Sequence, residues 1–217
     1  MKDVCIIIPT HKEVLTGNDE KSFLQTLNIF KNKDIKLIIP NNISDNFYIK
    51  YDIEIIKLSS EWFKSPSAYN AMCCEKEFYE LFRDYKYVLI CQTDAWVFKD
   101  NLDYFIGLDC DYYGAPWPQN HNLIGNGGLS LRKTEKMIEI CEKYTYDGRV
   151  NEDIWFSINH KTDMKICDIK TACNFSIETP SNSNLNMVDD YPMGVHGKIM
   201  FKTWGDGKDF KRKYYGK

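Results

Sequence analysis

The sequence predicts an α/β fold in one domain, with a mixed, mostly parallel sheet flanked by helices. Over the first two-thirds of the chain, short β-branched runs alternate with stretches whose apolar residues recur at helical spacing. The polar residues Gln92-Thr93-Asp94 follow the most hydrophobic run, at residues 87–91. Open α/β sheets bind ligands at the carboxyl ends of such strands. The chain has 217 residues, 43% of them hydrophobic, which is enough for one sizeable core.

The apolar runs and the helical periodicity place the elements in order. Strands are expected at residues 4–8, 35–39, 53–58, 87–91 and 128–132, and Pro9 and Pro40 end the first two. Helices are expected at residues 20–31, from Ser65-Pro66 onward, at 134–144 and from Asn151 onward. Residues 111–126, rich in aromatics, Pro, Gly and Asn, are expected to form a loop, as is the chain from residue 181 onward.

Composition excludes several classes of protein. The chain carries 28 basic and 31 acidic side chains, so its charge of -3 gives no electrostatic basis for binding nucleic acid. The first apolar run reaches a proline too early for a signal peptide, and no run is long enough to cross a bilayer, which predicts a cytoplasmic protein. The eight cysteines form no C-x-x-C pair and are expected to be reduced and mostly buried.

Two acidic segments are candidates for chemistry. Asp94 directly follows the strand at 87–91, where a carboxylate can bind Mn or Mg together with substrate phosphates; the alternative is an Asp that caps a turn. Glu152 and Asp153 precede a helix that carries Trp155. One of them could act as a general base, although acidic residues at a helix N-terminus are equally expected from dipole complementarity.

Two glycine-containing segments are further candidates. His196 lies between Gly194 and Gly197, in an expected flexible segment where its ring could reach a metal or simply be exposed. Asn126-Gly127-Gly128 precedes a strand and allows either close approach of backbone to a ligand or a plain turn. No phosphate loop and no G-x-G-x-x-G fingerprint is present, which disfavours P-loop enzymes and dinucleotide dehydrogenases.

Seven segments, taken in order, resemble a bacterial glycosyltransferase-like family of the GT-A fold, long known as a domain of unknown function. The resemblance covers roughly residues 1–200. The segments are Ile6-Ile7-Ile8-Pro9-Thr10-His11-Lys12-Glu13, Ser67-Ala68-Tyr69-Asn70, Leu89-Ile90-Cys91-Gln92-Thr93-Asp94, Asp111-Tyr112-Tyr113-Gly114-Ala115-Pro116-Trp117, Gly125-Asn126-Gly127-Gly128-Leu129-Ser130-Leu131-Arg132, Asn151-Glu152-Asp153 and Gly194-Val195-His196.

The resemblance implies a Rossmann-type, GT-A-like sheet with a donor half at residues 1–98, an acceptor and catalytic half at 99–200, and a basic tail at 201–217. It implies a nucleotide-sugar donor as co-substrate, bound by Pro9, Thr10, His11, Glu13, Asn70, Gln92, Thr93 and Asp94. Gln92-Thr93-Asp94 matches a D-x-D motif whose first Asp is replaced by Gln92, which adds no charge for a cation. Asp94 and His196 are the implied ligands of Mn or Mg.

The same resemblance implies Asp153 as the general base of an inverting reaction and Glu152 as a contact to the acceptor or the donor sugar. Asn126, Gly127 and Gly128 are expected to approach the sugar, with Trp117 and Trp155 as stacking faces. The expected function is transfer of a hexose from a UDP-sugar to a bacterial surface-glycan acceptor such as a capsule or lipopolysaccharide precursor. The alternatives are an inactive carbohydrate- or nucleotide-binding protein on this fold and, more distantly, a nucleotidyltransferase.

The tail, with Lys208, Lys211, Arg212 and Lys213, suggests contact with phosphate or with an anionic lipid-linked acceptor at the inner face of the membrane; a solvated terminus is the alternative. The oligomeric state is not predicted by the sequence.

Overall fold

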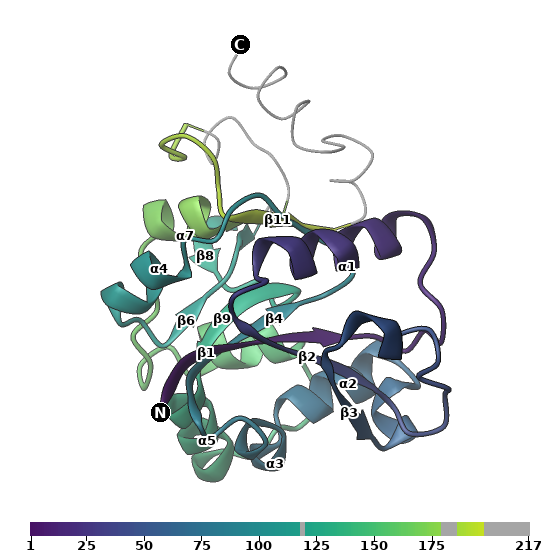
Figure 1. Cartoon of the computed structure of the whole chain (residues 1–217). Coiled ribbons are helices and arrows are strands. Elements are labelled where there is room, and N and C mark those ends of the chain that lie inside the picture. The colour runs from purple at the N-terminus through teal and green to yellow at the C-terminus, as the bar shows by residue number, and fades with distance from the viewer. Residues whose placement is uncertain (118–119, 179–185, 198–217) are drawn as a thin grey trace.

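The computed structural model describes residues 1–117, 120–178 and 186–197, and the expected basic tail lies outside these residues. A six-stranded sheet forms the centre of the molecule, in the order β3-β2-β1-β4-β9-β6 (Figure 1). Its strands are β1 (Lys2–Pro9), β2 (Asp34–Pro40), β3 (Glu54–Leu58), β4 (Tyr85–Cys91), β6 (Tyr112–Tyr113) and β9 (Leu129–Lys133). The first four are mutually parallel, and β9 runs antiparallel to both of its neighbours, which confirms the expected mixed sheet.

Helices cover both faces of this sheet and make three layers. In Figure 1, α1 (Gly17–Ile29) crosses one face, and α2 (Pro66–Cys73), α3 (Lys76–Glu80) and α5 (Thr134–Lys143) lie on the other. β4 divides its side chains accordingly, since Leu89 and Cys91 join the core under α1 whereas Val88 and Ile90 join the core over α5. The buried parts of β1, β2 and β4 are mostly apolar because both faces of the sheet are covered there.

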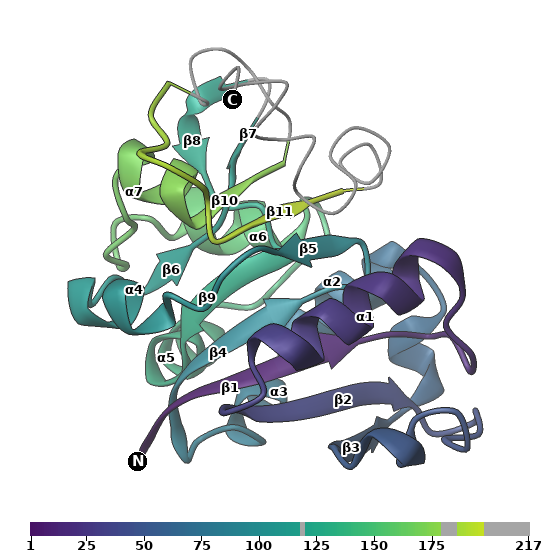
Figure 2. The ribbon, with the colours of Figure 1, turned by 45° about the horizontal axis from the view of Figure 1, so that its top comes forward.

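Beyond the central sheet the structure has several short strands, and three of them, β7, β8 and β11, lie where loops were expected. A second sheet has the order β10-β11-β5, and β7 pairs with β8 in a hairpin (Figure 2). These strands are β5 (Ala95–Val97), β7 (Pro116–Trp117), β8 (Asn120–Ile124), β10 (Ser176–Ile177) and β11 (Gly194–His196). The expected loop at 111–126 is therefore wrong, because the local pairing of β7 with β8 orders part of it. The expected flexible segment at His196 is also wrong, because β11 pairs with β5, which is distant in the chain.

The remaining helices complete the shell. The helix expected from Ser65 onward is broken at Cys74 into α2 and α3. α4 (Leu102–Leu108) and α7 (Ile169–Phe175) join α1 on its face of the sheet, and α6 (Glu152–Ile154) continues into a π-helical turn at Trp155–Asn159. Two 3-10 turns lie at Ile49–Tyr51 and Ser60–Phe63.

Two predictions from composition can be compared with the structure. All eight cysteines are free thiols and all but Cys141 are buried, as expected. Within the described ranges, no helix combines the length and the apolar character that a membrane span requires.

Candidate active site

A cleft of about 680 Å³ opens where β1 and β4 end. In the sheet, β2 and β3 lie on one side of β1, whereas β4 lies on its other side. The strand order therefore reverses at the boundary between β1 and β4, which makes this boundary a topological switch point. The carboxyl ends of strands at such a switch point are where open α/β sheets bind ligands. Six of the expected donor-binding residues line this cleft: Pro9, Thr10, His11, Gln92, Thr93 and Asp94.

His196, near the end of the described residues, contacts two residues that line this cleft. β11 pairs antiparallel with β5, with His196 opposite Ala95, and so the imidazole is delivered beside the residues that follow β4. Its Nε2 lies 3.2 Å from Asp94 Oδ1 and 3.3 Å from Gln92 Oε1. The structure therefore brings together the two expected metal ligands.

The electrostatics of His196 are dominated by its acidic neighbours. Burial alone would lower the pKa of this imidazole, but hydrogen bonding and charge from Asp94 and Glu178 outweigh burial and raise the pKa to about 9. Glu178 Oε1 lies 3.8 Å from His196 Nδ1, on the opposite side of the ring from Asp94. These two carboxylates thus favour the protonated ring, and His196 must release that proton before its Nε2 can bind a metal.

The donor atoms around His196 Nε2 fit a small divalent cation. Adjacent ligands of an octahedral Mg²⁺ ion are about 3.0 Å apart when each bond is about 2.1 Å long, close to the spacings to Asp94 and Gln92. In the part of the chain that the structure describes, no three His, Cys, Asp or Glu side chains gather into a metal site. The protein thus offers a partial shell, of the kind that substrate phosphates and water complete.

The turn at Gly127-Gly128 packs directly against this group. A Cβ atom on Gly128 would lie 1.9 Å from His196 Nε2, so no larger residue fits without moving the ring. The carbonyl of Gly128 accepts a hydrogen bond of 2.9 Å from the backbone N–H of Gln92. The close approach expected of these glycines is therefore made, in this structure, to His196 and the backbone of Gln92.

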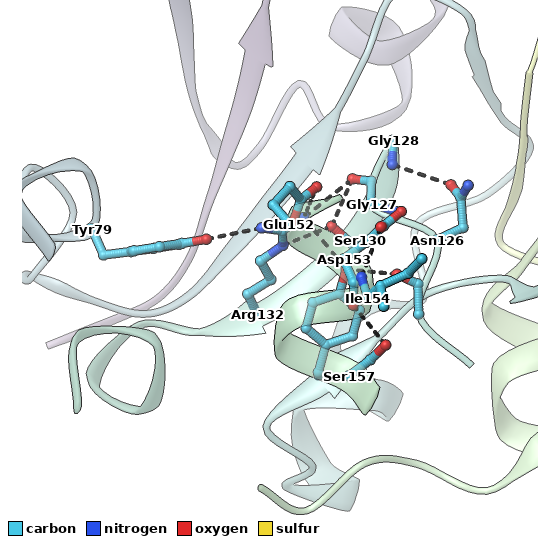
Figure 3. Close-up of polar contacts among 12 residues, drawn as sticks. Tyr79, Asn126, Gly127, Gly128, Ser130, Arg132, Glu152, Asp153, Ile154 and Ser157 are labelled. Atoms are coloured by element: carbon cyan, nitrogen blue, oxygen red, sulfur yellow. Dashed lines mark hydrogen bonds and ion pairs between the residues drawn. The ribbon is translucent and has the colours of Figure 1, made fainter. Parts of the chain in front are cut away.

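Asp153 lies on the other side of the same turn. Its Oδ2 accepts a hydrogen bond of 3.2 Å from the Gly127 N–H, and its Oδ1 accepts one of 2.8 Å from the Ile154 N–H (Figure 3). The side chain is 7% exposed. Burial, followed by the negative charge of Glu152, raises the pKa of Asp153 to about 7, which suits a group that accepts a proton near neutral pH.

Glu152 points into the protein and forms an ion pair with Arg132. Its two carboxylate oxygens lie 3.0 and 2.9 Å from guanidinium nitrogens, and both side chains are almost fully buried. Figure 3 shows the guanidinium also reaching Tyr79 and Ser130. These contacts give Glu152 a structural partner and do not support the expectation that it touches a sugar.

Four other expected residues lie away from the cleft. Trp155 is 4% exposed and packs edge-on against Tyr146 and Phe156, so the expectation of a sugar-stacking face there is not supported. Asn70 donates to Asn151 Oδ1 at 3.1 Å and does not line the cleft, and neither does Glu13, which is exposed. Trp117 ends β7, is partly buried and lies outside this cleft, and its role stays a prediction.

The prediction missed several residues of the site. Lys12 and Asp19 line the cleft and form an ion pair, and Tyr69 lines it as well. Acidic residues in the first turn of a helix usually complement its dipole, so Asp19 gave no separate signal. Arg132 ends an apolar strand run, and nothing in its spacing indicates a partner 20 residues later.

Comparison with known proteins agrees with this architecture. A family model described as "Protein of unknown function (DUF5672)" matches residues 52–196. No curated protein gives a significant sequence match.

Among solved structures, the galactosyltransferase LgtC in complex with donor and acceptor sugar analogues is similar, with a TM-score of 0.59, 11% identity and coverage of 95% of this chain and 94% of that one. The apo glycosyltransferase GlyE of Streptococcus pneumoniae TIGR4 is similar with a TM-score of 0.58 and 12% identity. The match covers 90% of this chain and 54% of the GlyE chain. Mouse xyloside xylosyltransferase 1 is similar with a TM-score of 0.53 and 7% identity, and the match covers 91% of this chain and 97% of that one. These likenesses confirm the GT-A-like fold.

Proposed function

The chain belongs to the family of proteins of unknown function DUF5672, and we propose that it is a glycosyltransferase that uses a nucleotide-sugar donor. The observation that carries this proposal is the cleft between the ends of β1 and β4, with Asp94, Gln92 and His196 grouped at its edge. That place in an α/β sheet suits a nucleotide, and the grouped side chains suit a diphosphate with its cation. The glycosyltransferase fold of the similar structures supports the same class of enzyme.

We assign the donor site to the first half of the chain, residues 1–98, with UDP as the expected nucleotide. Pro9, Thr10 and His11 would face the nucleoside, and Asp94 and His196 would hold Mn or Mg beside the diphosphate. When bound, such a cation supplies positive charge that stabilises a departing diphosphate. Gln92 contributes an uncharged oxygen, so most of the cation's negative neighbours would come from Asp94 and the donor itself.

We assign the general base to Asp153, in the second half of the chain at residues 99–200. In the proposed reaction, an acceptor hydroxyl oxygen bonds to the anomeric carbon as the bond from that carbon to the diphosphate oxygen breaks. The hydroxyl proton passes to the Asp153 carboxylate, and the anomeric configuration inverts. Support comes from the pKa of about 7 and from the position of Asp153 across the Gly127-Gly128 turn from His196.

The proposed acceptor is a bacterial surface-glycan precursor, either free or lipid-linked, and the proposed location is the cytoplasm or the inner face of the membrane. This part of the proposal comes from the family resemblance alone. Trp117 is retained as a candidate contact for the acceptor sugar.

The test is donor turnover. The protein would be incubated with a panel of UDP-hexoses and Mn, with and without EDTA, and release of UDP would be followed. We expect slow hydrolysis that EDTA and Asp94→Asn each abolish, whereas Asp147→Asn, at an exposed site that pairs with Arg149, leaves it unchanged. Binding of UDP-sugars without turnover, across donors and acceptors, would instead identify a protein that binds sugars without catalysis.

The role of Asp153 needs its own measurement. Once an acceptor is found, Asp153→Asn should lower the transfer rate at least 100-fold while donor binding persists. Proton NMR of the product would report the anomeric configuration. Full transfer by Asp153→Asn, or a product with retained configuration, would show that the assignment of the base is wrong.

A further inference from the structure

We propose that Lys12 binds the diphosphate of the donor, and that its ion pair with Asp19 is the resting state which the diphosphate replaces. The inference rests on the proposed function and adds to it a residue with no other role in the site. Lys12 and Asp19 both line the cleft between β1 and β4. The ion pair joins Lys12 Nζ to Asp19 Oδ2.

The backbone of Lys12 is fixed at two points. Its N–H donates to Thr10 Oγ1 at 3.2 Å, and its carbonyl accepts a hydrogen bond of 2.6 Å from the hydroxyl of Tyr48. Tyr48 is fully buried, and burial raises its pKa to about 12, so its hydroxyl remains a donor. A lysine anchored in this way presents its ammonium group at the cleft without ordering a loop when the ligand arrives.

The side chain itself is free enough to exchange partners. The Lys12 side chain is 40% exposed and that of Asp19 is 25% exposed, and an ion pair in contact with water contributes little stability. Asp19 has a second partner, since its Oδ1 accepts a hydrogen bond of 3.3 Å from Thr93 Oγ1. The carboxylate therefore keeps a hydrogen bond when Lys12 turns to a phosphate.

The charges of the cleft favour this exchange. Gln92 is neutral and Asp94 is negative, so the loop after β4 supplies no cation for a diphosphate. Of the two lysines that line the cleft, Lys64 is exposed and pairs with Glu61 at 2.5 Å, on the wall formed by α2 and the preceding turn. Lys12 comes instead from the β1 side and is linked through Asp19 to Thr93, next to Asp94. An ammonium group at that place is a point charge well suited to phosphate oxygens.

The experiment compares a ligand that carries phosphates with one that does not. Calorimetry would measure UDP and uridine binding to the wild-type protein and to Lys12→Met, Lys12→Arg, Asp19→Asn and Lys21→Met, with Mn and with EDTA. Lys21 lies on α1, is exposed and does not line the cleft, so Lys21→Met is the matched control. Thermal unfolding of each variant would confirm that it is folded.

We expect Lys12→Met to weaken UDP binding about 10- to 100-fold while uridine binding changes less than about twofold. Lys12→Arg should keep most of the affinity for UDP, and Asp19→Asn should strengthen it about two- to fivefold in EDTA, because the competing carboxylate is gone. Unchanged UDP binding in Lys12→Met, or equal losses for UDP and uridine, would overturn the inference and leave the proposed function intact. A folded wild-type protein that binds no nucleoside diphosphate would refute the proposed function, and the role of Lys12 with it.

Discussion

The ion pair between Arg132 and Glu152 gives a prediction whose size follows from burial. Arg132 is fully buried and Glu152 is 3% exposed, and the nearest nitrogen–oxygen distances are 2.9 and 3.0 Å. Arg132→Met leaves the carboxylate of Glu152 buried without its counter-ion. Removing one partner of such a pair typically costs about 3–5 kcal/mol, which for a chain of this size lowers the melting temperature by roughly 6–20 °C.

A second change separates the charge from the packing. In the double variant Arg132→Met/Glu152→Gln, the stranded negative charge is gone, so the free energy of unfolding should recover by at least about 1 kcal/mol relative to Arg132→Met. Recovery is incomplete because the buried hydroxyl of Tyr79, to which Arg132 donates at 2.8 Å, still lacks that partner.

Urea unfolding at pH 7.5, followed by circular dichroism, measures both effects. The control is Arg149→Met, at a highly exposed arginine, which should change the free energy of unfolding by less than about 0.5 kcal/mol. A loss below about 1 kcal/mol in Arg132→Met, or a double variant no more stable than Arg132→Met, would refute the reasoning that a buried, uncompensated charge dominates here.

Four further predictions concern the same region. The pKa of Asp153 lies above its ordinary value of 3.8, so the stability that this residue contributes is present below pH 4 and is lost as the pH rises through about 7. At pH 8 the free energy of unfolding of Asp153→Asn should therefore exceed that of the wild type by roughly 2–4 kcal/mol, and this difference should vanish in acid. Chemical denaturation at each pH measures it. Wild-type transfer should instead increase with pH through an apparent pKa near 7 in a pH–rate profile, and a flat profile would contradict the role of Asp153. Gly128→Ala must displace the His196 ring, so it should weaken Mn-dependent UDP binding at least about tenfold in calorimetry, while equal affinity would show that the ring is not needed there. Trp155→Ala should destabilise the protein by about 3–5 kcal/mol in the same unfolding assay, and a loss below 1 kcal/mol would argue against its place in the core.

The central sheet could be predicted from the sequence because its signals are local. The runs that became β1, β2 and β4 are apolar on both faces and bounded by proline or by polar residues, and the helices between them have regular apolar spacing. The place of Gln92, Thr93 and Asp94 followed from the same reasoning, since strand ends of a parallel sheet share one edge.

The parts that the sequence did not predict depend on contacts distant in the chain. Gly194–His196 has too few residues for a strand pattern, and it is ordered by pairing with β5. Glu152 looks the same in sequence whether it faces a sugar or Arg132, and Trp155 fits equally well as part of an apolar helix face or as a binding surface. The position of Arg132 on β9 decides for Glu152, because the two form an ion pair. The contact with Phe156 decides for Trp155, because it places the indole in the core.

The three-residue strand that carries His196 determines when the site can form. His196 meets Gln92 across a separation of 104 residues, so a growing chain would have its β1 and β4 sequences in place roughly 5–20 s before His196 is made. The cleft at the ends of β1 and β4 can thus begin to form before His196 is made. Because β11 adds only three residues to its sheet, a ligand that bridges Asp94 and His196 would also stabilise the pairing of β11 with β5, so that ligand binding and the docking of β11 are coupled.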